Sequence, residues 1–595
     1  MFCAHSKFAQ ALVAFCGVVS VFAVPASCLA QDPTPTQTTL SLAPGVSVVA
    51  GTRVTLSAHV TANGFAFHNG IVFFCKADAA HCEDSALLGS APIQPGGWAK
   101  VRLHLGVGTY SIRAVFQGML NSTTPRSGST SDPQTLTVKG KAETITTSIT
   151  PALANGVYTL SSRVASFGRP SISGNLSFTD SLDGGGPVSL GTAPLVSTNT
   201  VIGLLANTAT QITGNVVDYA TGDFNHDGIP DLVAVNSLGN SLSILLGKGD
   251  GTFNPPTQLS VDTHPEQVVV ADFNADGFDD LAVTYPLAGN VAILLGKSDG
   301  TFAAATHVNA APDVQDLVVG DFNGDGKLDI VTGAVQSSTV STLLGNGDGT
   351  FGALLNLNIG ENIFGLQSGD FNNDNVPDLA VATTHGIWVL LGTGNGSFSV
   401  APLLSAGNVS KIAVADFNGD GIADLATISS QTSTPALSVY ISNGDGSFTL
   451  KSTPVPSSTT SSPASLVVAD FNGDGIQDIA VNSFPPDPNT SSVKILLGKG
   501  DGTFPKSTSP VLATLPSSAL VADFNGDGIP DLITERSNNQ INTTSVAVLA
   551  GIQITTGAIH NVTLSTPGSH SISAAFSGSA LLAPSEGPSV TITIP

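Results

Sequence analysis

Short apolar or alternating runs, separated by Gly, Asn, Asp and Ser, fill most of this chain of 595 residues. Residues 232–235, 242–246 and 257–261 are runs of this kind, and residues 54–60 alternate strictly between apolar and polar side chains. Runs of this length and period are typical of β-strands, and the Gly-rich breaks between them are typical of tight turns. The pattern predicts an all-β protein with many short strands.

One nine-residue phrase, Asp-Phe-Asn-x-Asp-Gly-x-x-Asp, recurs through the centre of the chain. It starts at Asp223, Asp272, Asp321, Asp416, Asp470 and Asp523, with a variant at Asp370, and successive starts lie 46 to 54 residues apart. Each of the first six copies contains apolar runs, a Gly-Asp-Gly-Thr-Phe-like turn and a further run. Four short strands per roughly 50 residues are typical of a propeller blade. We therefore predict a seven-bladed β-propeller over residues 200–556, with an open solenoid as the alternative.

The two ends of the repeat block complement each other. The seventh copy reaches Gly551 and lacks both the Asp-Gly-Thr-Phe turn and the strand after it. Upstream of the first copy, residues 210–213 match residues 257–260, which form a predicted outer strand. We predict that residues 210–213 complete the seventh copy and close the ring, because closure removes the exposed strand edges of an open array.

Two related β-rich segments flank the repeats. Residues 38–140 have the strand spacing of an immunoglobulin-like sandwich. Residues 190–195 resemble residues 88–93 of that segment, but the strands that should follow are found only near the end of the chain, where residues 568–578 resemble residues 108–118. The second sandwich is therefore expected to be discontinuous.

The predicted fold is all-β: a seven-bladed propeller inserted into the second of two immunoglobulin-like β-sandwich domains. The second sandwich is assigned to residues 141–199 and 557–595. Neighbouring termini of a closed ring make such an insertion easy to accommodate. Residues 31–37 are expected to form a flexible leader.

The first thirty residues have the features of a secretory signal peptide. Lys7 precedes an apolar run over residues 8–24, and small residues lead to a cleavage point near Ala30. Lipid attachment at Cys28 is the alternative. No later run reaches the length of a membrane helix. We expect a secreted or cell-surface protein, monomeric and without a transmembrane helix.

Cys75 and Cys82 are the cysteines that remain after such cleavage. An even pair in an exported protein predicts a disulfide, with free thiols or a zinc site as alternatives. The formal net charge of -24 argues against nucleic acid and anionic membranes as partners and favours cations.

The repeated phrase offers the ligands that a hard cation prefers. Calcium takes six to eight oxygen ligands from carboxylates, amides and backbone carbonyls. Positions 1, 3, 5 and 9 supply side-chain oxygens, and position 7, where the residue type varies, supplies a carbonyl. The predicted ligands of about seven structural Ca²⁺ ions are Asp223, Asn225, Asp227, Ile229, Asp231, Asp272, Asn274, Asp276, Phe278, Asp280, Asp321, Asn323, Asp325, Lys327, Asp329, Asp370, Asn372, Asp374, Val376, Asp378, Asp416, Asn418, Asp420, Ile422, Asp424, Asp470, Asn472, Asp474, Ile476, Asp478, Asp523, Asn525, Asp527, Ile529 and Asp531.

Other positions of the phrase serve its backbone and packing. Position 6 is Gly, as a positive φ requires, except for Asn375 in the fourth loop, which we expect to bind most weakly. The Phe at position 2 is expected to face the interior. Metal-free Asx turns are the alternative. However, three Asp in each loop would repel one another unless a cation neutralised them.

Residues 521–529, Val-Ala-Asp-Phe-Asn-Gly-Asp-Gly-Ile, and 496–504, Leu-Leu-Gly-Lys-Gly-Asp-Gly-Thr-Phe, resemble the FG-GAP/VCBS repeat family, whose relatives include the integrin α-chain propeller. The flanking segments resemble bacterial Ig-like repeat domains. This resemblance implies a calcium-stabilised propeller on a secreted or surface protein that serves adhesion or ligand binding. No integrin-type Asp-x-Ser-x-Ser is present, so integrin ligand recognition is not carried over.

The sequence favours a binding module over an enzyme. The histidines of the repeats occupy different offsets and form no recurring ligand set: His226, His264, His307 and His385. We predict a calcium-stabilised binding or adhesion scaffold that recognises protein or glycan ligands. One alternative is a lectin-like propeller with Trp388 as a possible ligand contact, although Trp388 could equally serve core packing. The other alternative is an extracellular enzyme that acts on polysaccharides.

Overall fold

The computed structural model describes residues 34–594 apart from internal gaps, the longest of which are 78–86, 120–125, 430–436, 453–461, 485–491 and 513–519. The predicted signal peptide, Cys28, and Cys82 lie outside the described residues. All regular elements of the described part are β-strands. In that part of the chain, no helix is long and apolar enough to span a membrane.

The first sandwich consists of two sheets packed face to face, as the alternation in residues 54–60 predicted. One sheet contains β1 (Thr36–Ala43), β3 (Val54–Ala62), β4 (Phe65–Ala66) and β7 (Trp98–Leu103). The other contains β2 (Ser47–Val49), β10 (Gln134–Lys139), β8 (Gly108–Met119), β5 (Ile71–Lys76), β6 (Leu87–Pro92) and β9 (Arg126–Thr130). Every second residue of β3 is buried, and Leu56 and Val60 pack with Phe74 and Phe116 in one core.

Six antiparallel sheets follow one another along the repeat block. The first three are β18 (Val216–Gly222), β19 (Asp231–Asn236), β20 (Ser241–Leu245) and β21 (Thr257–Ser260); β22 (Val268–Ala271), β23 (Asp280–Tyr285), β24 (Asn290–Leu294) and β25 (Thr306–Asn309); and β26 (Val314–Gly320), β27 (Asp329–Ala334), β28 (Thr339–Leu343) and β29 (Leu355–Asn358). The next three are β30 (Ile363–Gly369), β31 (Asp378–Thr383), β32 (Ile387–Gly392) and β33 (Phe398–Val400); β34 (Val409–Ala415), β35 (Asp424–Ser429), β36 (Leu437–Ser442) and β37 (Phe448–Ser452); and β38 (Ser462–Ala469), β39 (Asp478–Phe484), β40 (Ser492–Leu497), β41 (Lys506–Ser507) and β42 (Val511–Leu512). Each repeat therefore forms its own sheet, with its strands in chain order.

The seventh copy is completed by a strand from before the first. β43 (Val521–Ala522) and β44 (Asp531–Asn538) pair in order with the first part of β45 (Thr543–Val562), and β17 (Thr210–Thr213) adds to the free edge of β45. Ile212 of β17 is fully buried in one cluster with Phe524 of the seventh copy and Phe253 of the first sheet. The seventh sheet thus packs on the first.

The second sandwich is built from segments far apart in the chain. β13 (Val157–Ser166) carries β11 (Thr144–Thr146) and β12 (Thr150–Ala154) on one edge and the last part of β45 on the other. In the facing sheet, β14 (Gly174–Leu182) lies between β15 (Val188–Leu195) and β46 (Gly568–Phe576), and β46 also pairs with β47 (Ser585–Glu586) and β48 (Val590–Ile594).

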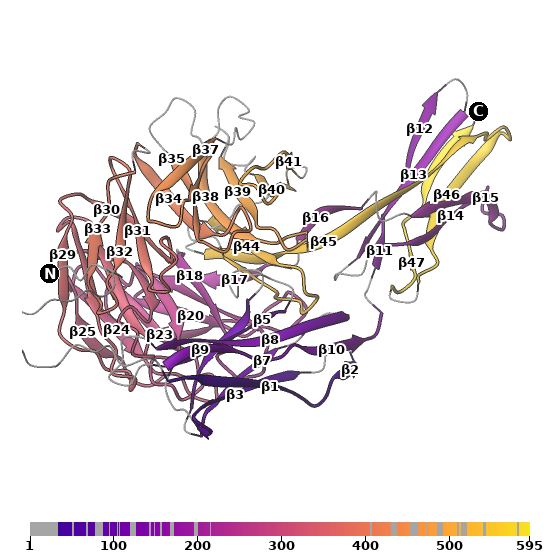
Figure 1. Cartoon of the computed structure of the whole chain (residues 1–595). Helices are drawn as coiled ribbons and strands as arrows, with labels where there is room; N and C mark the ends of the chain where they lie inside the picture. Colours follow the sequence, from indigo (N-terminus) through magenta and orange to yellow (C-terminus); the bar gives the residue numbers. More distant parts are fainter. Residues whose placement is uncertain are drawn as a thin grey trace, which may run out of the picture.

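β45 connects the repeat sheets to the second sandwich as one continuous strand of 20 residues, which crosses the gap between the two bodies in Figure 1. β16 (Thr200–Ala206) pairs with it over residues 549–555. The predicted domain boundary between residues 556 and 557 therefore falls inside a strand. Two paired strands, not a loop, connect the bodies.

Truncating the buried side chain of β17 tests how much this strand contributes. Ile212→Ala should lower the free energy of unfolding by about 3 kcal/mol, because it leaves a cavity between the first and seventh sheets. Thr213→Ala, at an exposed position of the same strand, is the matched control and should change it by less than about 0.5 kcal/mol. Equal unfolding curves for both variants would show that β17 does not hold the two sheets together.

Candidate metal centres in the repeated loops

Each nine-residue phrase forms the loop between the first and second strands of its sheet. In the first copy, β18 ends at Gly222 and β19 begins at Asp231, so that Asp223 opens the loop and Asp231 closes it. Position 6 has a positive φ in every copy, for example +83° at Gly228, and Asn375 adopts the same conformation with φ of +62°. The Phe at position 2 is buried in all seven loops, as predicted. The sequence therefore identified the backbone form of the loop.

The carboxylate at position 9 fastens the loop to its sheet. In the third copy, Asp329 accepts a hydrogen bond from the backbone N–H of Phe322 at 2.9 Å and a second from Gly345, at the end of β28, at 2.8 Å. The same two bonds occur in all seven copies. The Asp at position 9 is fully buried in each: Asp231, Asp280, Asp329, Asp378, Asp424, Asp478 and Asp531.

The side chains at positions 1, 3 and 5 turn into the loop. Asp321 accepts hydrogen bonds from the N–H groups of Asp325 and Gly326 at 3.1 and 2.7 Å. Asn323 shares the N–H of Asp325 at 2.8 Å, and Asp325 accepts from the N–H of Lys327 at 3.0 Å. Side-chain oxygens from three alternate residues are thereby gathered around one turn of backbone.

Burial and repulsion between neighbouring carboxylates disfavour the charged form of several Asp side chains in these loops. Burial raises the pKa of Asp329 to about 7, hydrogen bonding to Gly345 opposes this, and repulsion from Asp321 and Asp325 raises it further. Burial likewise raises the pKa of Asp321 to about 6, and that of Asp478 in the sixth loop to about 8. Like charges packed close together with little water favour a neutralising cation.

The donor set matches a hard divalent cation. Carboxylate and amide oxygens stand at positions 1, 3, 5 and 9, and a backbone carbonyl is available at position 7, which is the chemistry that calcium prefers. Across the described residues, no three His, Cys, Asp or Glu side chains converge as a metal-holding group by themselves. A bound cation would therefore draw on the Asn side chain and the carbonyl as well as on the carboxylates.

Asp279 is a loop residue that the sequence reasoning missed. It stands at position 8 of the second loop, and its Oδ2 accepts a hydrogen bond from the backbone N–H of Asp223 in the first loop at 2.6 Å. Burial raises its pKa, which the hydrogen bond to Asp223 opposes. The other loops have Pro, Leu, Ala or Gln at this position, so an acidic residue there was a visible signal. Asp279 links two neighbouring loops directly.

The Gly-Asp-Gly-Thr-Phe-like turns of the first six copies connect their sheets to neighbouring sheets. In the third sheet, Gly349 donates its N–H to the carbonyl of Phe273 in the second loop at 3.2 Å, and Phe351 packs edge-on against Phe273 with centroids 5.8 Å apart. The first and seventh sheets are connected in the same way. Gly251 donates to the carbonyl of Phe524 at 3.1 Å, and Phe253 packs edge-on against it at 5.6 Å.

The remaining predicted site residues lie apart from the loops. Cys75 is buried and disulfide-bonded, while its predicted partner Cys82 lies outside the described residues. Trp388 is half-buried on β32, opposite Val381, and packs against the core between the third and fourth sheets. Its indole Nε1 is buried without a hydrogen-bond partner among the described residues. The side chain thus serves packing, and a ligand contact by Trp388 stays a prediction.

The histidines of the repeats do not come together. His307 pairs with Asp262 at 3.2 Å on the outer strand of the second sheet, and His385 pairs with Glu361 at 3.0 Å in the fourth. His226 lies in the first nine-residue loop, with its ring edge-on to Phe278. Each histidine therefore has its own local surroundings.

Family models match both parts of this chain. The FG-GAP-like repeat matches residues 223–283, 272–332, 370–427, 428–481 and 486–534, and the FG-GAP repeat matches residues 314–351. The bacterial Ig-like domain (group 3) matches residues 40–139. The predicted family resemblance is confirmed. Among curated proteins, none matches this chain.

Several solved structures show a weak likeness. A putative 6-phosphogluconolactonase from Bacteroides uniformis is 14% identical with a TM-score of 0.37, covering 57% of this chain and 96% of its own. A protein of unknown function from Desulfotomaculum acetoxidans is 12% identical with a TM-score of 0.34, covering 60% and 93%. The polycomb repressive complex 2 of Chaetomium thermophilum is 12% identical with a TM-score of 0.33, covering 49% and 70%. At these scores nothing about function is transferred.

Removing a position-9 carboxylate should lower the free energy of unfolding whether or not metal is bound. Asp329→Ala leaves the buried N–H groups of Phe322 and Gly345 without their acceptor, and we expect a loss of roughly 3 kcal/mol or more in the free energy of unfolding. Asp348→Asn, in the exposed turn of the same sheet, is the matched control and should be close to neutral. Chemical denaturation of both variants in chelator checks this, and equal midpoints would contradict the fastening role of position 9.

Proposed function

We propose that this chain, which carries FG-GAP-like repeats and a bacterial Ig-like domain, is an extracellular calcium-stabilised binding scaffold. In this proposal the repeat sheets form a closed seven-bladed propeller inserted into the second of two Ig-like domains. The pairing of β17 with β45, the packing of the seventh sheet on the first, and the pairing of β14 with β46 support the arrangement. The signal-peptide-like start and the family membership support an extracellular location.

The observation that carries the calcium proposal is the sevenfold recurrence of a buried acidic loop. Each loop combines three Asp carboxylates, and burial together with repulsion from the neighbouring carboxylates raises the pKa of the position-9 Asp, as for Asp231 to about 7; the pKa of Asp223 at position 1 of the same loop is raised to about 6. Bound calcium would supply positive charge and oxygen coordination at these loops. Asp, Asn and the position-7 carbonyl of each copy would hold it.

Binding is favoured over catalysis by how the reactive side chains are distributed. The histidines of the repeats are separate, and each carboxylate at position 9 is occupied by two backbone N–H groups. Residues 296–300, Gly-Lys-Ser-Asp-Gly, have the Gly-x-Ser-x-Gly spacing of a nucleophile elbow. They form an exposed hairpin turn between β24 and β25, whereas such an elbow needs a strand-to-helix turn.

Exposed apolar side chains favour a protein ligand. Leu238 and Leu287, 73% and 74% exposed, occupy equivalent turns between the second and third strands of the first two sheets. These turns lie at the ends of the strands opposite the metal loops. Phe364, near the start of β30, is also 43% exposed. Exposed apolar groups that recur at equivalent positions suit a binding surface better than isolated ones do.

Chelation tests the calcium proposal. Full-length protein should unfold at a lower temperature in EDTA than in calcium, by at least several degrees, because any ion that binds only the folded state stabilises it by mass action. Magnesium at the same concentration should restore less stability, since it prefers smaller octahedral sites. A melting temperature that is the same in EDTA and in calcium would contradict the proposal.

Capture of ligands tests the binding proposal. Immobilised full-length protein should retain specific proteins from an extracellular extract in calcium, and Leu238→Ser with Leu287→Ser should reduce that retention without changing the melting temperature. A glycan array run in parallel distinguishes a sugar ligand from a protein ligand. If the double variant and the unchanged protein retain the same material, these turns are not the binding surface.

A further inference from the structure

The first sandwich lies against the side of the repeat sheets that carries the metal loops. Arg53 donates a hydrogen bond from Nη1 to the backbone carbonyl of His226 in the first loop at 3.1 Å. Gln94 lies beside the second loop, where a Cβ placed on Gly277 would come within 3.0 Å of its Nε2. The sandwich, coloured indigo in Figure 1, thus returns to the repeats although the second sandwich separates them in sequence.

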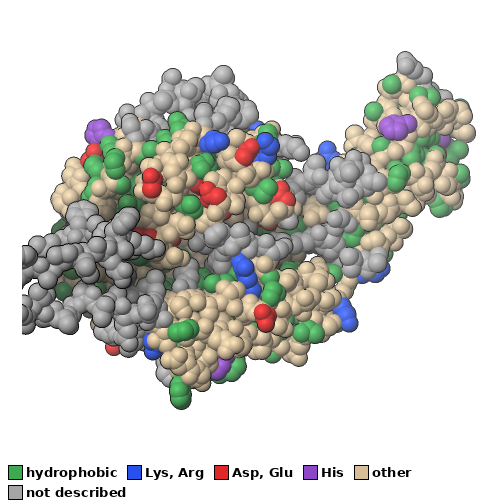
Figure 2. Space-filling view, viewed as in Figure 1, with side chains coloured by type: hydrophobic (Ala, Val, Ile, Leu, Met, Phe, Trp, Pro, Cys, Tyr) green, Lys and Arg blue, Asp and Glu red, His purple; other side chains and the backbone are tan. Residues whose placement is uncertain are grey.

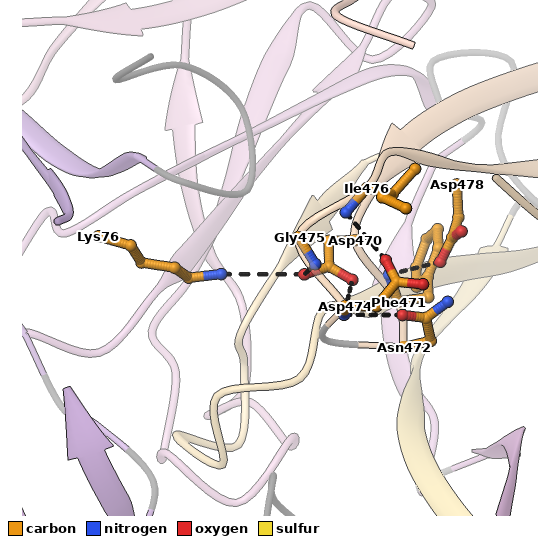
Figure 3. Close-up of polar contacts among 8 residues, drawn as sticks. All are labelled: Lys76, Asp470, Phe471, Asn472, Asp474, Gly475, Ile476 and Asp478. Atoms are coloured by element: carbon orange, nitrogen blue, oxygen red, sulfur yellow. Dashed lines mark hydrogen bonds and ion pairs between the residues drawn. The ribbon is translucent and has the colours of Figure 1, made fainter. Parts of the chain in front are cut away.

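A third contact involves a predicted metal ligand directly. The ammonium Nζ of Lys76, at the end of β5, lies 3.9 Å from Oδ2 of Asp470, which is position 1 of the sixth loop (Figure 3). The Asp470 side chain has no exposed surface, and that of Lys76 is 19% exposed. Asp470 also accepts the N–H groups of Asp474 and Gly475, both at 3.1 Å. The lysine therefore approaches the carboxylate around which the loop is folded.

The first sandwich and the repeat block have net charges of opposite sign. Residues 38–140 contain 7 Lys and Arg against 4 Asp and Glu, whereas residues 200–556 contain 9 Lys and Arg against 35 Asp and Glu. In Figure 2, acidic side chains are prominent on the repeat sheets, and Lys and Arg appear at several points of the first sandwich below them. Opposite charges of this kind favour docking and fix its orientation.

The sixth and seventh sheets, near which Lys76 approaches the sixth loop, lack a connection that the other pairs of neighbouring sheets have. In every other pair of neighbouring sheets, a Phe of one sheet's turn packs edge-on against the position-2 Phe of the preceding loop, as Phe448 does against Phe371, and in most of them a turn Gly N–H also donates to the carbonyl of that Phe. The seventh copy has no such turn to hold Phe471. A contact from the first sandwich therefore falls where the connection between neighbouring sheets is reduced.

We propose that the first sandwich is a calcium-responsive cap on the loop face, with Lys76 as a counter-cation of the sixth loop. This rests on the calcium binding proposed above. The sixth loop contains the carboxylates of Asp470, Asp474 and Asp478, and a divalent ion there offsets most of their charge. Calcium thereby weakens the attraction for Lys76, because the Coulomb energy scales with the net charge. The docked cap and the bound ion oppose each other.

Thermodynamic reciprocity makes this coupling measurable at one loop. If calcium weakens docking of the cap, then the cap must weaken calcium binding by the same factor. Replacing Lys76 with a neutral residue should therefore raise the calcium affinity of the sixth loop. For a partly exposed ion pair, we expect an increase of about twofold to fivefold.

The experiment is amide hydrogen exchange with mass spectrometry on the full chain across a series of free calcium concentrations. It follows the peptide with residues 470–478 separately from the peptide with residues 321–329. Lys76→Gln should move the calcium midpoint of protection for residues 470–478 to about twofold to fivefold lower concentration. The midpoint for residues 321–329 should not move. Lys100→Gln, an exposed lysine on β7 of the same sandwich, is the matched control and should move neither midpoint.

Small-angle X-ray scattering on the same samples measures whether the first sandwich is docked on the repeat sheets. The radius of gyration of the unchanged protein should rise slightly on calcium addition, because the docking equilibrium of the first sandwich shifts by about the same twofold to fivefold factor, and Lys76→Glu should show the larger value even in EDTA. Calcium-dependent protection with the same midpoint in Lys76→Gln and Lys100→Gln would overturn the coupling and leave calcium binding intact. Absence of calcium-dependent protection in every loop would overturn calcium binding itself, and the coupling with it.

Discussion

A buried carboxylate at the end of each nine-residue loop is the contact on which the rest of the repeat structure depends. One oxygen of this carboxylate receives the N–H of the second loop residue, and the other receives an N–H at the end of the third strand, as Asp329 does with Phe322 and Gly345. A single side chain thereby fixes the loop to its own sheet. Because this carboxyl group is held away from water, its charged form is unfavourable unless a nearby positive charge stabilises it.

The fixed loop in turn provides the surface on which the next sheet packs. Its Phe is buried, and in most copies the carbonyl of that Phe accepts the N–H of the turn glycine of the neighbouring sheet while the two aromatic rings meet edge to face. Such aromatic pairs contribute roughly 0.5–1.5 kcal/mol each beyond simple burial. The pair of Phe253 with Phe524 joins the first sheet to the seventh, and β17 shares the same cluster. Local loop chemistry and the long-range arrangement of the sheets therefore rest on the same residues.

Features that recur in the chain could be predicted from sequence, and features that occur once could not. The backbone form of the loop, the positive φ at position 6 including Asn375, the buried Phe and the pairing of residues 210–213 with the seventh copy all leave a repeated or matching signal. The continuity of β45 through a predicted domain boundary leaves no such signal in the sequence. A strand shared by two bodies has the same alternation of apolar and polar residues as two separate strands. The return of the first sandwich to the loops depends on single contacts, such as that of Arg53 with His226, between residues far apart in sequence. Asp279 was visible as an acidic exception at position 8, but its hydrogen bond to Asp223 becomes evident only when two loops are seen side by side.

The metal content of the folded protein tests the central claim most directly. Full-length protein, dialysed against buffer with a fixed saturating concentration of free calcium, should carry about seven calcium ions per chain by elemental analysis, one for each copy of the loop. A variant with Asp321→Ala and Asp325→Ala should carry about one fewer. Protein that is folded by circular dichroism and holds no calcium under these conditions would contradict the account.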